Sequence, residues 1–228
     1  MKIDYIMPKK IYKSNYNNSC AEISNYIRQE IMHNHNTAIK RRINPDTNAG
    51  MIIYPEDLPE SFWQFFHNSF TDVLNTEQLI YNDYVIESQW INHQQEGVEV
   101  EAHSHPNCMF AANFYLDVMP PNNVIMFHNA DQPFRSFHAI ATKDMRIFDE
   151  EVIEYKVASG DLIFFRSDLT HSVPMVLGHG MERLSIVFNI RLTGIGFAGS
   201  GTQGVNTGSE EYARYSTHNR GFSNFIKD

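Results

Sequence analysis

The stretch YVIESQWINHQQEGVEVEAHSHPNCMFAANFYLDV, residues 84–118, decides the fold class of this chain. It divides into short runs with the apolar character of strands, and turn-forming residues separate the runs. The same pattern continues downstream, so strands are predicted at 84–92, 98–105, 110–118, 124–128, 151–156, 161–166 and 183–190. Several short strands with no helices between them indicate a sandwich or jelly roll rather than a parallel α/β sheet.

The residues before 84 show helical spacing instead. Ser19, with Glu22 three positions later, predicts a helix N-terminus, and Ile23, Ile27 and Ile31 follow at intervals of four. A second helix is predicted to begin near 59–61. Its apolar side comprises Phe62, Phe65, Phe66, Phe70, Val73 and Leu74. Aromatic residues at helical spacing are typical of a hydrophobic core.

We therefore expect one mainly β domain, a double-stranded β-helix of the jelly-roll or cupin type with N-terminal helices packed on its outside. A chain of 228 residues is long enough for such a unit. Its expected parts are a helical support region at 1–83, a jelly-roll core at 84–193, and a tail or lid at 194–228 that is rich in Gly, Ser, Thr and Asn.

Charge and composition exclude several classes of protein. The formal net charge is −9, which disfavours a nucleic-acid partner because a polyanion requires a basic surface. The only dense basic stretch, Lys40–Arg42, is interpreted as a solvated loop. Cys20 and Cys108 lack the spacing of a zinc site or disulfide framework, which favours a reducing compartment.

The N-terminus, MKIDYIMPKK, lacks the apolar centre of a signal peptide. No apolar run in the sequence approaches the length that crosses a bilayer. We therefore expect a cytoplasmic protein with no membrane partner. Among assemblies, a homodimer is mildly preferred.

His103-Ser104-His105 is the most informative triplet in the sequence. Residues two apart in a strand face the same side, so the two imidazoles can converge on one metal ion. Imidazole binds iron, zinc, copper and nickel, and the spacing alone does not choose among them. By itself the pair is equally consistent with two histidines on a polar strand face without a metal.

Downstream residues strengthen the metal hypothesis. The turn and apolar strand at 159–165 precede His171, which is expected in a polar loop. Arg183 and Ser185 then share one face of the next strand. A guanidinium beside a hydroxyl is suited to hold a carboxylate, because the planar fork of arginine matches the two carboxylate oxygens.

These motifs resemble those of iron(II)/2-oxoglutarate-dependent dioxygenases. More narrowly, the sequence is similar to a bacterial and phage 2-oxoglutarate/iron oxygenase-like family with Trp-x-Asn, His-x-His-Pro and Arg-hydrophobic-Ser motifs in this order. The motifs that carry the resemblance are Trp90-Ile91-Asn92, His103-Ser104-His105-Pro106, Gly160-Asp161 through His171, and Arg183–Asn189. They cover roughly residues 84–192.

The resemblance implies that His103 and His171 are metal ligands and that Arg183, helped by Ser185, binds the far carboxylate of 2-oxoglutarate. His105 stands where the wider superfamily has a carboxylate, so three histidines would form the ligand set in place of two histidines and one acid. Glu101 and Asp168 are alternative acidic ligands, although both are interpreted as solvated acids. Asn113 is expected either to contact 2-oxoglutarate or to satisfy buried backbone groups. No catalytic residue beyond the metal ligands is predicted.

The predicted function is the oxidation, primarily the hydroxylation, of a small molecule or a protein side chain. The expected cofactor is iron(II), and dioxygen and 2-oxoglutarate are the expected co-substrates. One alternative is a cupin-like three-histidine metal enzyme that does not use 2-oxoglutarate. Another is a catalytically silent jelly-roll binding or structural protein. The substrate itself cannot be read from the sequence.

Overall fold

The computed structural model describes residues 9–16, 20–43, 50–79, 81–128 and 152–193. The helical elements are α1 (Cys20–Tyr26), the π-helical turn η1 (Ile27–Met32), α2 (His35–Arg41), the 3₁₀ turn η2 (Pro55–Asp57) and α3 (Glu60–Glu77). The strands are β1 (Ile11–Asn15), β2 (Gly50–Ile52), β3 (Asp83–Gln95), β4 (Val100–His103), β5 (Phe110–Asp117), β6 (Val124–His128), β7 (Val152–Lys156), β8 (Asp161–Arg166), β9 (His171–Val173) and β10 (Glu182–Thr193).

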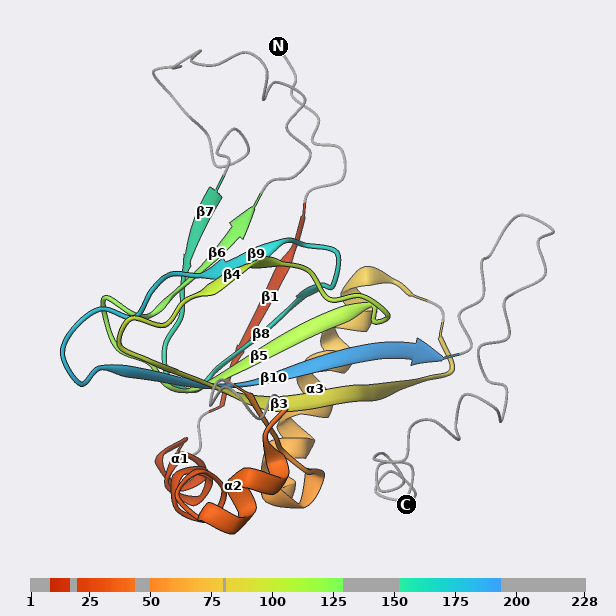
Figure 1. Ribbon diagram of the computed structural model, residues 1–228. Helices are drawn as coiled ribbons and strands as arrows, with labels where there is room; N and C mark the ends of the chain where they lie inside the picture. Colours follow the sequence, from red (N-terminus) through yellow and green to blue (C-terminus); the bar gives the residue numbers. More distant parts are fainter. Residues whose placement is uncertain (1–8, 17–19, 44–49, 80, 129–151, 194–228) are drawn as a thin grey trace, which may run out of the picture.

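The strands form two antiparallel sheets that face each other (Figure 1). The major sheet has the order β1-β8-β5-β10-β3-β2, and the minor sheet has the order β4-β9-β6-β7. From β3 to β10 consecutive strands alternate between the two sheets, except that β6 and β7 both lie in the minor sheet, and this winding is the double-stranded β-helix. The predicted fold class is therefore confirmed, and every predicted strand is present with ends that differ by a few residues.

Three short strands were not predicted. β1 and β2 lie in the region expected to be helical, and they extend the two edges of the major sheet by pairing with β8 and β3. β9 is a three-residue strand in the minor sheet. Strands of this length carry too few residues to show a period of two, so only their pairing partners define them. Ser19 and the tail at 194–228 lie outside the described residues.

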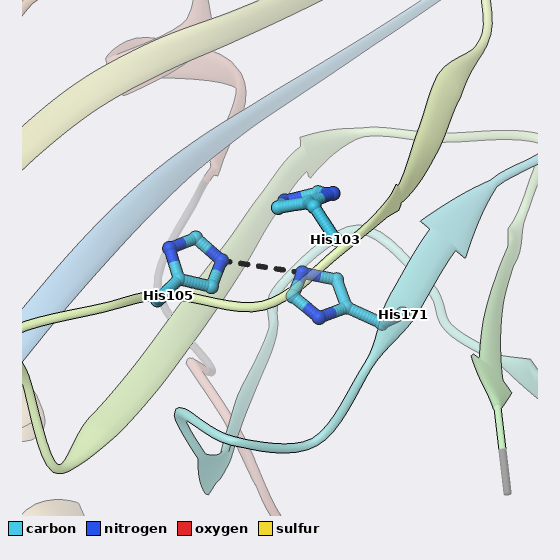
Figure 2. A group of neighbouring side chains, drawn as sticks. All are labelled: His103, His105 and His171. Carbon is cyan, nitrogen blue, oxygen red and sulfur yellow. Dashed lines mark hydrogen bonds between the residues drawn. The ribbon is translucent and has the colours of Figure 1, made fainter. Parts of the chain in front are cut away.

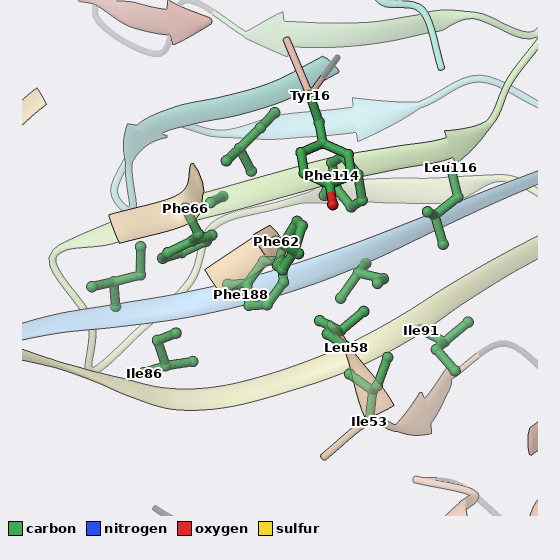
Figure 3. Packing of buried hydrophobic residues seen from close by; sticks show 14 of the residues in the cluster. Tyr16, Ile53, Leu58, Phe62, Phe66, Ile86, Ile91, Phe114, Leu116 and Phe188 are labelled. Atoms are coloured by element: carbon green, nitrogen blue, oxygen red, sulfur yellow. The ribbon is translucent and has the colours of Figure 1, made fainter. Parts of the chain in front are cut away.

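α3 covers the outer face of the major sheet with an aromatic layer (Figure 3). Phe66 is fully buried at its centre, with ring centroids 4.9 Å from Phe188 of β10 and 5.4 Å from Phe164 of β8. Phe62 and Phe114 pack in the same layer at a centroid distance of 4.7 Å. The aromatic residues at helical spacing are thus core residues, as predicted, although Phe65 is only partly buried.

The first helix also buries the predicted stripe, since Ile23, Ile27 and Ile31 are all in the core. Arg28, in the π-helical turn η1 that continues α1, pairs with Asp117 at the end of β5 and with Glu182 at the start of β10. These ion pairs fix the helix against one end of the major sheet.

The interpretation of Lys40–Arg42 as a solvated loop was wrong. Lys40 and Arg41 belong to the last turn of α2, where cations are favoured by the helix dipole. Arg41 forms an ion pair with the buried carboxylate of Asp57, and its guanidinium lies 4.6 Å from the Tyr54 ring centroid.

Among the helices of the described residues, none has the length and apolar character that crossing a membrane requires.

A second, smaller core fills the space between the two sheets. Its buried members include Ala111 and Tyr115 of β5, Phe127 of β6, and Ile163 and Phe165 of β8. Strand alternation explains the division, because β5 and β8 direct successive side chains to the α3 layer and to the inter-sheet space. The inter-sheet space is where the histidines meet.

The aromatic layer gives a stability prediction. Replacing Phe66 with alanine should lower the free energy of unfolding by about 3–5 kcal/mol, because the fully buried ring leaves a cavity between α3 and the sheet. Gln64→Ala, at an exposed position of the same helix, should change it by less than about 0.5 kcal/mol. Urea unfolding of both variants measures the difference, and equal values would contradict the packing.

Candidate metal centre

Antiparallel pairing brings two of the three predicted histidines together. His103 ends β4 and lies directly opposite His171, the first residue of β9. His171 is therefore in a strand, and the expectation of a polar loop was wrong. Facing residues in an antiparallel pair direct their side chains to the same side, so the register itself makes the imidazoles neighbours.

A register shift in β4 changes which side chains of this strand face the inter-sheet space. Between the pairs Val100–Val173 and His103–His171, β4 has one more residue than β9, which is a β-bulge. The bulge breaks the alternation that would have placed Glu101 on the same face as the histidines. Glu101 is exposed, and so is Asp168, which pairs with Arg166. Both acids lie outside the histidine cluster, in agreement with their interpretation as solvated side chains.

The three imidazoles face one another in the inter-sheet space (Figure 2). The ring centroids of His103 and His171 are 4.4 Å apart, and that of His105 lies 5.1 Å from His103 and 5.0 Å from His171. The possible ligand nitrogens all lie within 4.8 Å of one another. This is the only such group of histidine, cysteine or acidic side chains in the described ranges.

Backbone carbonyls orient two of the rings. Nδ1 of His103 is 2.8 Å from the carbonyl oxygen of Glu101, and Nδ1 of His171 is 3.0 Å from that of Leu169. Because a carbonyl only accepts, each Nδ1 donates its proton, and the lone pair of each ring is on Nε2. This is the arrangement that holds metal-ligating histidines in place.

Burial keeps two of the rings neutral. Removal from water lowers the pKa of His171 to about 3 and that of His105 to about 4, and neighbouring imidazoles lower both further. His171 is packed against the ring of Phe165 at a centroid distance of 4.8 Å. Neutral imidazole is the form that binds a metal, so neither ring requires deprotonation at neutral pH.

The donor set fits a metal ion. Nε2 of His105 lies 3.2 Å from Nε2 of His171. Two nitrogens each about 2.1 Å from one ion, at an angle of 90–110°, are roughly 3.0–3.4 Å apart. The ligands are three neutral nitrogens, a set that suits iron, zinc, copper or nickel. His103 is only partly buried, so one side of the cluster remains accessible.

The inner face of the major sheet carries the second predicted group. Arg183 and Ser185 of β10 are 2% and 3% exposed and share this face. Nη1 of Arg183 donates to the backbone carbonyls of Asn122 and Val124, at the start of β6 in the minor sheet. Its guanidinium carbon lies 5.1 Å from the ring centroid of the buried Tyr115, and burial lowers the pKa of this arginine.

Several polar atoms on this face have no hydrogen-bond partner within the described part of the chain. They are Nε of Arg183, Oδ1 of Asn113, and both amide atoms of Gln94. Asn113 is 6% exposed and makes one long contact, 3.5 Å from Nδ2 to the Tyr115 hydroxyl, so it does not satisfy backbone groups there. Buried polar atoms in this state indicate a place where a polar ligand completes the structure.

The sequence analysis missed two residues of this face. Gln94 is one, and Asn189 is the other. The Asn189 side chain acts on the His105 ring and raises its pKa against the effect of burial, although Asn189 Oδ1 makes no regular hydrogen bond within the described ranges. Alternation from Arg183 through Ser185 to position 189 was a signal that could have identified Asn189.

Comparison with known proteins agrees with this site. Residues 88–189 match the sequence model of a family described as "Putative 2OG-Fe(II) oxygenase". A search of curated proteins gave no match. The solved structure of a prolyl-4-hydroxylase from Pseudomonas putida is similar to this one, and the alignment covers 80% of this chain and 92% of the hydroxylase chain. The sequence identity is 15% and the TM-score is 0.51.

The structure of HygX from Streptomyces hygroscopicus, solved with nickel and 2-oxoglutarate bound, is also similar. The alignment covers 80% of this chain and 83% of the HygX chain. Its identity is 12% and its TM-score 0.52. At these identities the two structures show a shared fold.

The fold is the double-stranded β-helix, and the three histidines form a group that could hold a metal ion. Residues 88–189, somewhat less than half of the chain, are thus similar to a family of 2-oxoglutarate- and iron(II)-dependent oxygenases. The matched residues, 88–189, include all three histidines and Arg183. The family match and the histidine cluster support an oxygenase that uses iron(II) and 2-oxoglutarate.

The depressed pKa values predict how stability depends on pH in the metal-free protein. Between pH 6.5 and about 4 the unfolded chain protonates His105 and His171 while the folded chain keeps them neutral. The unfolded state therefore binds more protons, and the free energy of unfolding should fall by about 4–5 kcal/mol, roughly 2–2.5 kcal/mol for each imidazole, as the pH drops from 7 to 4.5.

Urea unfolding in the presence of a chelator measures this fall. The His171→Gln variant, which cannot titrate at that position, should show a clearly smaller decrease over the same pH range. Equal decreases in the wild type and the variant would contradict a buried neutral imidazole at position 171.

Proposed function

We propose that His103, His105 and His171 are the ligands of iron(II), that Arg183, Ser185 and Asn113 bind 2-oxoglutarate, and that the enzyme hydroxylates a small molecule or a protein side chain. The observation that carries the proposal is the convergence of three ring nitrogens within 4.8 Å beside a buried, polar and incompletely bonded surface. A purely structural inter-sheet core has no need of either feature.

The three histidines differ in what they contribute. His171 is held by its packing against Phe165 and by the Leu169 carbonyl, so it is the most rigid of the three. His105 is buried beside the Trp90 ring, at a centroid distance of 6.0 Å. His103 is partly exposed and lies at the accessible side. Bound iron(II) supplies the redox chemistry that couples dioxygen and a 2-oxo acid to substrate oxidation.

Arg183 is prepared to bind a carboxylate. One edge of its guanidinium is fixed by the carbonyls of Asn122 and Val124, which hold the side chain across the inter-sheet space. Nε, on another edge, is buried and has no partner among the described residues. A carboxylate at this edge gains a charge-assisted hydrogen bond in a dry environment, and the arginine loses little conformational entropy because it is already ordered.

Charge balance supports a dianionic co-substrate. Three neutral imidazoles leave the full double positive charge of iron(II), one unit more than two histidines and an acid would leave. The buried Arg183 adds a further positive charge in the same space. A dicarboxylate compensates these charges, whereas the inter-sheet residues alone do not.

We retain the expectations of a cytoplasmic location and a homodimer within this proposal. Both cysteines are free, which is in line with a reducing compartment.

Substitution of the histidines tests the ligand set. His103→Ala, His105→Ala and His171→Ala should each weaken iron(II) binding by at least about 100-fold, more than the cost of losing a residue that only supports a ligand. His179→Ala, at a fully exposed position, should bind as the wild type does. Metal analysis and anaerobic titration with iron(II) provide the measurement.

A carboxylate at position 105 separates a ligand from a packing residue. His105→Asp restores the two-histidine, one-carboxylate set and should retain iron(II) binding that His105→Ala loses. If both variants bind iron(II) like the wild type, His105 is not a ligand and the three-histidine proposal fails.

Co-substrate binding distinguishes this function from a cupin-like enzyme that does not use 2-oxoglutarate. Adding 2-oxoglutarate to the anaerobic iron(II) protein should produce the visible charge-transfer absorption of a chelated 2-oxo acid. Arg183→Met should weaken 2-oxoglutarate binding about 10–100-fold, the usual range for one charge-assisted hydrogen bond. Arg166→Met, at a half-exposed arginine of β8, is the matched control. A wild type without this absorption would favour the cupin-like alternative.

A further inference from the structure

Gln94 carries a buried side-chain amide. It lies near the end of β3 and is 1% exposed, yet neither Nε2 nor Oε1 has a hydrogen-bond partner among the described residues. Within those residues it is the one side chain for which both polar atoms are buried and unpartnered. Burying an amide in this state lowers stability, so a structural role does not account for it.

The strand register places this amide beside the carboxylate-binding arginine. Gln94 is directly opposite Arg183 in the β3–β10 pair, so their Cβ atoms are about 4.5–5.5 Å apart on the same face. That face is the inner one, because Arg183 reaches from it to the carbonyls of the minor sheet. Nε of Arg183 also has no partner among the described residues, so two facing side chains between the sheets carry three such polar atoms.

Gln94 lies at the end of this face that is distant from the histidines. Trp90, next to the His105 ring, and Gln94 share one face of β3 by alternation. They are four residues apart, roughly 13 Å along the strand. A ligand that is held at the histidines and extends along this face therefore points toward Gln94 and Arg183.

We propose that Gln94 is a specificity-determining residue that donates its amide hydrogen bond, together with Arg183, to the distal carboxylate of 2-oxoglutarate. The inference rests on the proposed function, and it adds a residue that the Arg-x-Ser pattern does not contain. Arg183 supplies the positive charge. Gln94 supplies a neutral donor whose burial is compensated only when a second carboxylate is present, so 2-oxo acids without one are rejected.

A pair of 2-oxo acids tests the role of Gln94. Full-length protein loaded with iron(II) under anaerobic conditions is titrated with 2-oxoglutarate and, separately, with pyruvate, which has the same 2-oxo acid group but no distal carboxylate. Visible absorption and calorimetry give the two dissociation constants. Gln94→Leu should raise the constant for 2-oxoglutarate about 10–100-fold and leave that for pyruvate unchanged within about twofold.

Two further variants sharpen the comparison. Gln94→Glu has nearly the same shape but places a negative charge opposite the bound carboxylate, so it should weaken 2-oxoglutarate binding at least as much as Gln94→Leu. Gln95→Leu, at the exposed neighbouring position on the other face of β3, should change neither constant.

Thermal unfolding of the metal-free protein separates ligand binding from a structural role. Gln94→Leu removes two unpartnered buried polar atoms and keeps most of the volume, so the Tm should rise, by about 2–4 °C. A lower Tm for Gln94→Leu would show that the amide supports the fold, and the proposal would be overturned.

The titrations distinguish the failure of this inference from that of the proposed function. If the wild type binds 2-oxoglutarate and Gln94→Leu binds it equally well, Gln94 has no role in recognition while the proposed function stands. Equal weakening for 2-oxoglutarate and pyruvate would place the effect at the metal and overturn the assignment to the distal carboxylate. If the wild type binds neither acid, the proposed function fails and this inference fails with it.

Discussion

The pairing of His103 with His171 is the interaction on which the site depends. These residues come from distant parts of the chain, and only the antiparallel register of β4 and β9 places them face to face. The bulge in β4 directs Glu101 to solvent and lets His105 approach from the following turn. Burial then lowers the pKa of His105 and His171, so these two imidazoles are in the neutral form that binds a metal ion.

β10 connects this site to the stability of the fold. Its even-numbered residues from 184 to 190 belong to the aromatic and aliphatic layer under α3, while Arg183 and Ser185 face the inter-sheet space. One strand therefore carries core residues on one face and Arg183 and Ser185 on the other, and a shift of its register by one residue would exchange the two faces. Packing of the aromatic layer thus fixes the register of β10 and, with it, the position of Arg183.

The polar side chains on the inner face of the major sheet lower the stability of the fold. Arg183, Asn113 and Gln94 bury polar atoms that have no partner within the described residues, although apolar side chains of similar size would fill the same space. Such incomplete bonding is typical of binding surfaces, where a ligand supplies the missing partners. In the proposed site, three neutral imidazoles would leave the charge of the metal ion uncompensated, which favours binding of an anionic co-substrate.

The sequence by itself determined the fold class, most strand positions, the aromatic side of α3 and the three histidines, because alternation, helical spacing and short motifs are local patterns. The tertiary structure alone decided what depends on distant pairing. β1 and β2 join the major sheet through their partners, and His171 is in a strand because β4 and β6 flank it. Gln94 has no motif of its own, and only its register opposite Arg183 gives it a neighbour to act with. Side-chain chemistry can be read residue by residue, whereas proximity is a property of how the sheets close on each other.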